Sequence, residues 1–150
     1  MKSNTLGHIL IVDDEAEIRE MLARHFHFLG YQTHTASDGK EALAIMAEKR
    51  FDVVISDIMM PHMDGVTLLK HISEQFPMVR VIMITGYITL ENALACMRRH
   101  AETCIFKPLS DLTELEKAVQ HAIETLDNWN QKFHELQGMD PNKEIEHYGK

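Results

Sequence analysis

The chain has 150 residues, of which 45% are hydrophobic and 25% charged, as in an ordinary globular protein of one domain with its own core. Its net charge of −8 at pH 7 argues against binding to nucleic acid or to an anionic membrane. The two cysteines have no metal-binding spacing, and no apolar stretch is long enough for a leader or a membrane span, so we expect a cytoplasmic protein.

The first half of the chain alternates between strand and helix patterns. A short apolar strand is expected at 8–12, and the helix that follows has apolar residues every three or four positions until Gly30 stops it. A second strand at 31–36 leads into a turn and a capped helix. The third strand begins at Phe51 and ends at Asp57. Its apolar, β-branched residues are typical of a strand buried on both faces.

The same alternation continues in the second half. Pro61 and the Asp64-Gly65 pair predict a turn, and a helix begins near Gly65. A fourth strand is expected at 79–84, then a helix, a short strand at 103–106 and a final helix from near Asp111. Five strands that alternate with five helices predict an α/β fold, in which right-handed crossovers place helices on both faces of a parallel sheet.

The final helix is longer than the sheet requires. About four turns would cover the sheet, but apolar residues continue at steps of three and four well beyond that length. We therefore divide the chain into a domain at 1–126 and a helical extension with a tail at 127–150. The extension either folds back or pairs with a second copy as a short coiled coil. The apolar positions are Leu112, Leu115, Val119, Ala122, Leu126, Trp129, Phe133 and Leu136.

Polar residues follow four of the predicted strands: Asp13 and Asp14, then Asp57, Thr85 and Lys107. The carboxyl ends of parallel strands meet at one rim, so these side chains should converge. Each alone is commonly a helix cap or a solvated side chain, but their combination indicates a site. Clustered carboxylates require a cation, and Mg²⁺ suits oxygen ligands. A lysine and a hydroxyl suit a phosphoryl group, which indicates a carboxylate that attacks phosphorus to give an aspartyl phosphate.

These motifs identify a resemblance to the receiver domain of two-component response regulators, from about residue 8 to residue 126. The matching parts are Asp13-Asp14, the segment 57–65, Thr85-Gly86 and Lys107-Pro108. The resemblance implies the flavodoxin-like, doubly wound (βα)5 fold, here with an extended C-terminal helix. It also implies that the chain accepts a phosphoryl group from the histidine of a sensor kinase or phosphotransfer protein, with Mg²⁺ as cofactor.

The resemblance also implies a role for each residue near the acceptor. Asp57 is expected to be the phosphoacceptor and to contribute to the Mg²⁺ site. Asp14 would be the direct metal ligand, Asp13 would act mainly through a bound water, and the backbone carbonyl of Met59 would be a further ligand. Lys107 would pair with the phosphoryl oxygens.

The switch residues are implied in the same way. The peptide before Pro108 should be cis, and Thr85 should move to hydrogen-bond the phosphoryl group. Receivers couple that movement to an aromatic residue three positions before the lysine, but Cys104 occupies this position here. We therefore expect a switch carried by Thr85 and the loop through Tyr87. Neither Met59 nor Tyr87 is an acid or amide that could orient water, which predicts slow self-dephosphorylation.

Three classes of function follow from these residues. A switch that binds partners and is not an enzyme fits best. An aspartate-nucleophile phosphatase would usually carry an acid two residues after the nucleophile, where this chain has Met59. A phosphate-independent adaptor would not need the complete site. The residues after Gly138 are too few for a DNA-binding domain, so the chain is either the front module of a longer regulator, which the long helix favours, or a stand-alone regulator.

Overall fold

The computed structural model of the chain describes residues 5–139, in which strands and helices alternate as predicted. The strands are β1 (His8–Val12), β2 (Gln32–Ala36), β3 (Val53–Asp57), β4 (Arg80–Thr85) and β5 (Thr103–Phe106). The helices are α1 (Ala16–Phe28), α2 (Gly39–Glu48), α3 (Gly65–Gln75), α4 (Leu90–Arg98) and α5 (Thr113–Met139). No helix among residues 5–139 combines the length and the apolar character needed to cross a membrane.

The five strands form one parallel sheet in the order β2-β1-β3-β4-β5. From β1 the chain moves to one side to form β2 and then returns to the other side of β1 to form β3. The switch point of the sheet therefore lies between β1 and β3. Ligands of open α/β sheets bind outside the carboxyl ends of the strands at such a point.

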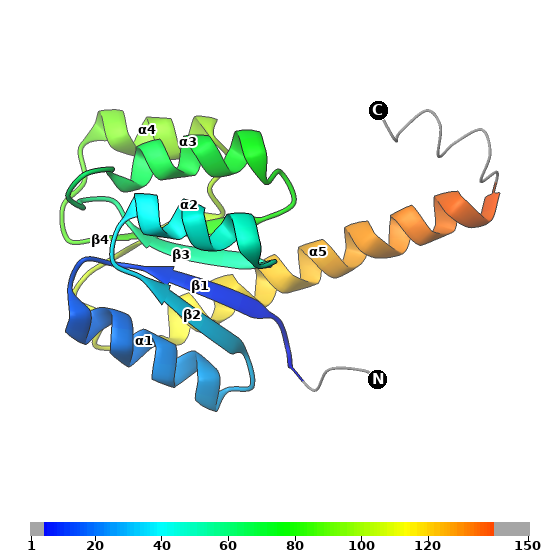
Figure 1. The fold of residues 1–150 in the computed structure, drawn as a ribbon, viewed down its shortest axis with the longest axis horizontal. Helices are drawn as coiled ribbons and strands as arrows, with labels where there is room; N and C mark the ends of the chain where they lie inside the picture. Colours follow the sequence, from blue (N-terminus) through cyan, green and yellow to red (C-terminus); the bar gives the residue numbers. More distant parts are fainter. Residues whose placement is uncertain (1–4, 140–150) are drawn as a thin grey trace.

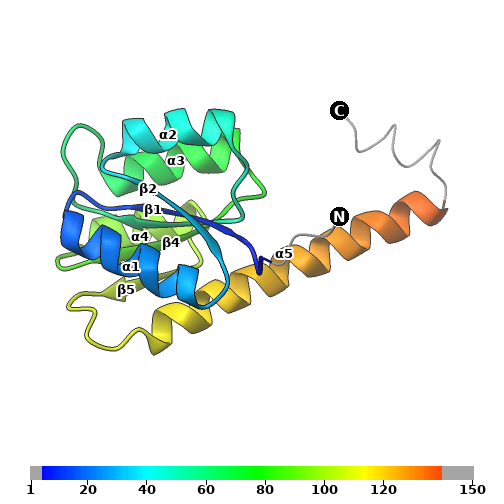
Figure 2. The same cartoon turned by 60° about the horizontal axis from the view of Figure 1, so that its bottom comes forward.

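The helices cover both faces of the sheet (Figures 1 and 2). Alternate residues of β1 point to opposite faces, as the period of a strand requires. Ile9 and Ile11 pack in the core beneath α1 and α5, whereas Leu10 and Val12 pack in the core beneath α2, α3 and α4. All four side chains are fully buried, which explains why β1 is apolar from Ile9 to its carboxyl end.

Local polar contacts fix where the helices begin. The side chain of Asp38 accepts a hydrogen bond from the Glu41 backbone, which confirms the predicted cap before α2. Asp64 caps α3 in the same way through Thr67. The final helix begins at Thr113, close to Asp111 as predicted, and the Asp111 carboxylate accepts hydrogen bonds from both the backbone and the hydroxyl of Thr113.

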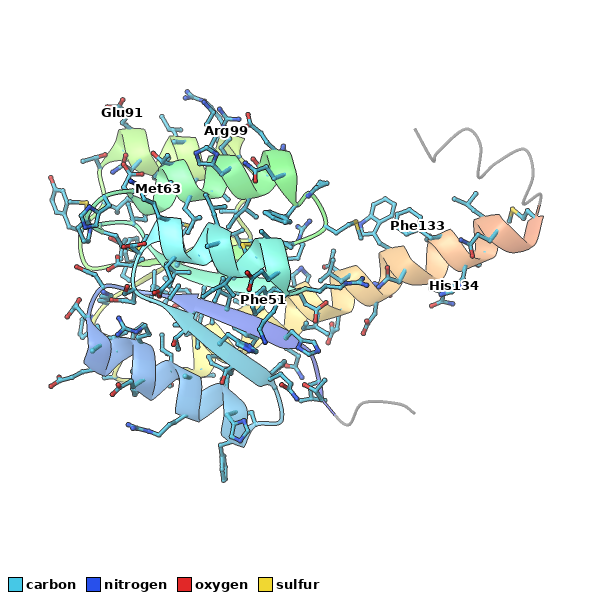
Figure 3. All side chains as sticks on the ribbon, viewed as in Figure 1. Phe51, Met63, Glu91, Arg99, Phe133 and His134 are labelled. Carbon is cyan, nitrogen blue, oxygen red and sulfur yellow. The ribbon has the colours of Figure 1, made fainter. Side chains whose placement is uncertain are left out.

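Helix α5 projects far beyond the sheet, as Figure 1 shows. Its buried residues end at Leu126, and the helix then continues without a break to Met139. Residues 127–139 therefore do not fold back onto the domain, which excludes one of the two predicted arrangements for this part. Trp129 and Phe133 are 53% and 43% exposed on the projecting segment, with their rings stacked 6.0 Å apart. Phe133 is labelled in Figure 3.

Candidate functional site

The carboxyl rim of the sheet brings together the predicted acids and the predicted lysine. Asp13 directly follows β1, Asp57 is the last residue of β3, and Lys107 directly follows β5. Ligand oxygens of four acids, Asp13, Asp14, Glu15 and Asp57, all lie within 4.8 Å of one another. The convergence predicted from the strand ends is therefore present in the structure.

The ammonium group of Lys107 lies between three of these acids. Its Nζ is 3.0 Å from Asp57 Oδ2, 3.2 Å from Asp13 Oδ2 and 3.0 Å from Glu15 Oε1. Burial alone would lower the pKa of Lys107, but hydrogen bonds to Asp57 and Glu15 and the charge of Asp13 outweigh burial and raise it. The lysine is therefore positively charged across the physiological pH range.

Asp13 has a buried carboxylate oxygen that bears on whether a metal ion fits this site. Its side chain is fully buried, and burial is the main reason that its pKa is raised. The Glu15 backbone donates to Asp13 Oδ1 at 2.8 Å. The other oxygen, Oδ2, is buried and has no hydrogen bond of good geometry, although Lys107 lies within ion-pair distance. Clustered carboxylate oxygens suit a hard divalent cation, either directly or, as expected for Asp13, through a bound water, so this donor set fits Mg²⁺.

Glu15 is the member of this cluster that the sequence analysis missed. It directly follows Asp13-Asp14, so the only available signal was a third consecutive acid at a strand end. Such a residue is usually explained by the preference of helix N-termini for negative charge. In the structure its exposed side chain instead reaches Lys107, because α1 begins beside the lysine.

The loop after β3 helps to hold the Asp57 side chain in place. The backbone N–H of Met59 donates to Asp57 Oδ1 at 3.3 Å, and the Met59 side chain is 55% exposed above the rim. Gly65 donates its N–H to the Ile58 carbonyl at 2.8 Å. A Cβ atom on Gly65 would lie only 2.1 Å from the Asp57 carbonyl oxygen, so this close approach requires glycine. The metal-ligand role of the Met59 carbonyl stays a prediction.

Thr85 is buried at the end of β4, next to the predicted switch loop. Its hydroxyl donates to the Tyr87 carbonyl at 2.6 Å and accepts from the Tyr87 backbone N–H at 3.2 Å. The Thr85 carbonyl accepts a hydrogen bond from the backbone N–H of Lys107 at 2.8 Å. The Thr85 hydroxyl is thus hydrogen-bonded to the loop. The Thr85 backbone is hydrogen-bonded to Lys107, which carries the positive charge of the site.

The remaining two predicted positions lie on and just after β5. The Lys107-Pro108 peptide is cis, which confirms the expectation. Cys104 is half-buried on β5, and burial together with the neighbouring Cys96 and Glu114 raises the pKa of its thiol to about 11. It is therefore a small neutral thiol where receivers carry an aromatic ring.

The sheet order and the acidic rim with its lysine define a class: flavodoxin-like α/β proteins with an acidic site at the switch point. Within that class, the family model described as the response regulator receiver domain matches residues 9–120, and the chain belongs to this family.

Curated relatives support the family assignment. The chain is 40% identical over 119 residues to the regulatory protein AtoC of Escherichia coli, which covers 79% of this chain and 26% of AtoC. It is 38% identical over 117 residues to the DNA-binding transcriptional regulator NtrC of Salmonella typhimurium, which covers 78% of this chain and 25% of NtrC. The chain therefore spans about a quarter of the length of these regulators.

Solved structures of receivers have the same fold. A CheY-like receiver domain protein from Methanospirillum hungatei superposes with a TM-score of 0.79 at 30% identity, covering 83% of this chain and 98% of that one. NtrX from Brucella abortus, solved in complex with ATP, gives a TM-score of 0.77 at 33% identity, covering 85% of this chain and 29% of NtrX. Both comparisons confirm the predicted (βα)5 architecture.

Proposed function

We propose that this receiver domain is a phosphorylation-activated switch in which Asp57 accepts a phosphoryl group from the histidine of a sensor kinase or phosphotransfer protein. The observation that carries the proposal is the position of Asp57 Oδ2, 3.0 Å from the Lys107 ammonium and within 4.8 Å of the other acids. Its partners are proteins, since the net charge of −8 disfavours direct contact with nucleic acid or an anionic membrane.

In the phosphoryl transfer, the nucleophile and the positively charged groups have separate roles. An Asp57 carboxylate oxygen forms the bond to phosphorus while the phosphorus–nitrogen bond of the donor histidine breaks, and the leaving imidazole takes up the electron pair. Lys107 neutralises negative charge on the transferring oxygens. Asp14, Asp57 and the Met59 carbonyl would hold Mg²⁺, with Asp13 acting through water. The ion would supply further positive charge for the phosphoryl oxygens.

Incubating the chain with Mg²⁺ and an excess of a small acyl phosphate tests this proposal against the phosphatase alternative. A switch takes up one phosphoryl group per chain, visible as a single mass increment, and then stops consuming the donor. Sustained turnover of the donor far beyond one equivalent would identify a phosphatase instead. If the chain takes up no phosphate, the third class of function, a phosphate-independent adaptor, would be supported.

We further propose that Thr85 transmits the signal by exchanging hydrogen-bond partners. Its hydroxyl is bonded to Tyr87 at 2.6 Å in the described structure, so bonding to a phosphoryl group would release the Tyr87 carbonyl. The loop would then move, because the phosphoryl group would hydrogen-bond Thr85 in only one of the two states and would favour that state. The small thiol at Cys104 has no ring to swing, so the loop after β4 carries the change.

Slow loss of the phosphoryl group is the first prediction. Because Met59 and Tyr87 cannot orient a hydrolytic water, the phosphorylated chain should persist far longer than seconds after the donor is removed. Met59→Asn places an amide at the exposed rim and should shorten the lifetime about tenfold. Intact-mass spectrometry at successive times gives both lifetimes. Phe28→Asn, an equivalent change at an exposed residue of α1, is the control and should leave the lifetime unchanged. Release of phosphate from the unaltered chain within seconds would contradict the prediction.

We also propose that residues 127–150, of which 140–150 lie outside the described residues, belong to an extension distinct from the receiver domain at 1–126. We propose further that the chain is the front module of a longer regulator. Two observations support this: α5 continues well past its last buried residue, and the chain spans only about a quarter of its curated relatives. A stand-alone regulator is the alternative. The exposed Trp129 and Phe133 are the residues best placed to pair with a second copy.

Pairing through the projecting helix gives the second prediction. The chain of 150 residues should sediment as a dimer, and a chain ending at residue 126 as a monomer, because the truncation removes the apolar stripe. The double substitution Trp129→Lys and Phe133→Lys should also give a monomer, whereas Asn130→Ala on the same segment should not. A monomer in every case would remove the argument for a coiled coil.

A further inference from the structure

The opposite rim of the domain contains a pocket of about 510 Å³, which we call the amino-rim pocket. It lies where β1 and β2 begin and α2 ends, and its lining includes His8, His34, Lys49 and Arg50. Phe51, labelled in Figure 3, forms part of the wall. Strand β1 runs from this pocket to Asp13 at the acidic site, so the two sites lie at opposite ends of the sheet.

The lining carries an excess of positive charge. Lys49 and Arg50 form no ion pair with any residue that the structure describes. The lining contains one carboxylate, Asp52, and its Oδ2 accepts a hydrogen bond from the His8 backbone at 2.8 Å. In a chain of net charge −8, this pocket thus presents two cations against one carboxylate.

His34 adds a polar atom that lacks a partner. Its Nδ1 is shielded from solvent and makes no hydrogen bond within residues 5–139. Burial, then the charges of Lys49 and His8, lower the pKa of His34. The ring packs edge-on against Phe51, with centroids 5.5 Å apart. A buried polar atom without a partner is rare, and a water or ion is one explanation for it.

We propose that the amino-rim pocket binds a phosphate-bearing small molecule, with the phosphate on Lys49 and Arg50 beside His34. Arginine matches phosphate oxygens with two parallel hydrogen bonds, and lysine binds them as a point charge. A pocket of this volume accommodates a ligand up to the size of a nucleotide. Inorganic phosphate and a phosphate ester share this chemistry, and the experiment distinguishes them. The site does not depend on phosphorylation of Asp57.

A titration followed by ¹⁵N NMR tests the proposal on the full chain without Mg²⁺, at constant ionic strength. The probes are inorganic phosphate, adenosine monophosphate and uncharged adenosine. Saturable shifts in the backbone amides of 32–34 and 49–52 are expected with both phosphate-bearing probes and not with adenosine. Tighter binding of the nucleotide would identify a phosphate ester as the ligand class, and equal or tighter binding of inorganic phosphate would identify the free ion.

Charge-removing variants show whether the pocket or general attraction is responsible. Lys49→Gln with Arg50→Gln should weaken phosphate binding about tenfold or more. Lys40→Gln with Lys70→Gln removes the same charge from exposed positions on α2 and α3 and should leave binding unchanged. The proposal is overturned if no saturable shift occurs at about 10 mM probe, or if both double variants weaken binding equally.

Discussion

Replacing Asp57 with asparagine is expected to abolish phosphoryl uptake from both a sensor kinase and a small acyl phosphate. The amide has the same shape as the carboxylate, and its oxygen can still accept the Met59 N–H at 3.3 Å. It offers no anionic oxygen to attack phosphorus, so the loss is one of chemistry rather than of fold. Uptake should fall below detection by intact-mass spectrometry, while circular dichroism stays unchanged.

Asp64→Asn is the matched control for this experiment. Asp64 lies on the same rim and loses the same charge, but asparagine caps a helix as well as aspartate does, so α3 should be retained. This variant should take up one phosphoryl group, as the unaltered chain does. Uptake by Asp57→Asn at the unaltered rate would show that the acceptor is another acid of the cluster, such as the exposed Asp14 or Glu15.

The sequence predicts most of this site because each residue lies at the end of a strand. Asp13, Asp57 and Lys107 needed only the rule that parallel strands end at one rim. The structure places the ammonium of Lys107 within 3.2 Å of a carboxylate oxygen of each aspartate. Glu15 could not be predicted in this way. Its contact depends on where the long side chain of Lys107 settles among three competing carboxylates, which no local pattern encodes.

For the fold, the periodicity of the sequence predicts the secondary structure, whereas the packing of the elements on one another is less predictable. Alternating strand and helix patterns predicted the parallel sheet and the length of α5. They left open whether the end of α5 folds back, because its apolar spacing suits either arrangement. The amino-rim pocket was also not predicted. Lys49 and Arg50 follow a helix, where exposed basic residues are ordinary. Only the fold places them beside the first residues of β1 and β2, with which they line the pocket.

Gly65 provides the prediction with the largest expected effect on stability. In Gly65→Ala the added Cβ would lie 2.1 Å from the Asp57 carbonyl oxygen, 2.8 Å from Ile58 Cα and 2.9 Å from the Asp57 carbonyl carbon. All three are backbone atoms of the end of β3 and the loop after it, so no flexible side chain can yield. The substitution should cost about 3 kcal/mol in the free energy of unfolding, the upper range for overpacking. For a chain of this size, that corresponds to a fall in Tm of about 10 °C.

Urea unfolding of Gly65→Ala and Gly138→Ala separates this clash from the intrinsic preference of helices for alanine. Gly138 lies in α5 with no atom within 4 Å of an added Cβ, so alanine there should stabilise the helix by up to about 1 kcal/mol. Gly65→Ala should lower the urea midpoint, and because it displaces the Asp57 backbone it should also slow phosphoryl uptake. An unaltered midpoint would show that the loop after β3 can move away at no cost, and so that it does not fix the position of Asp57.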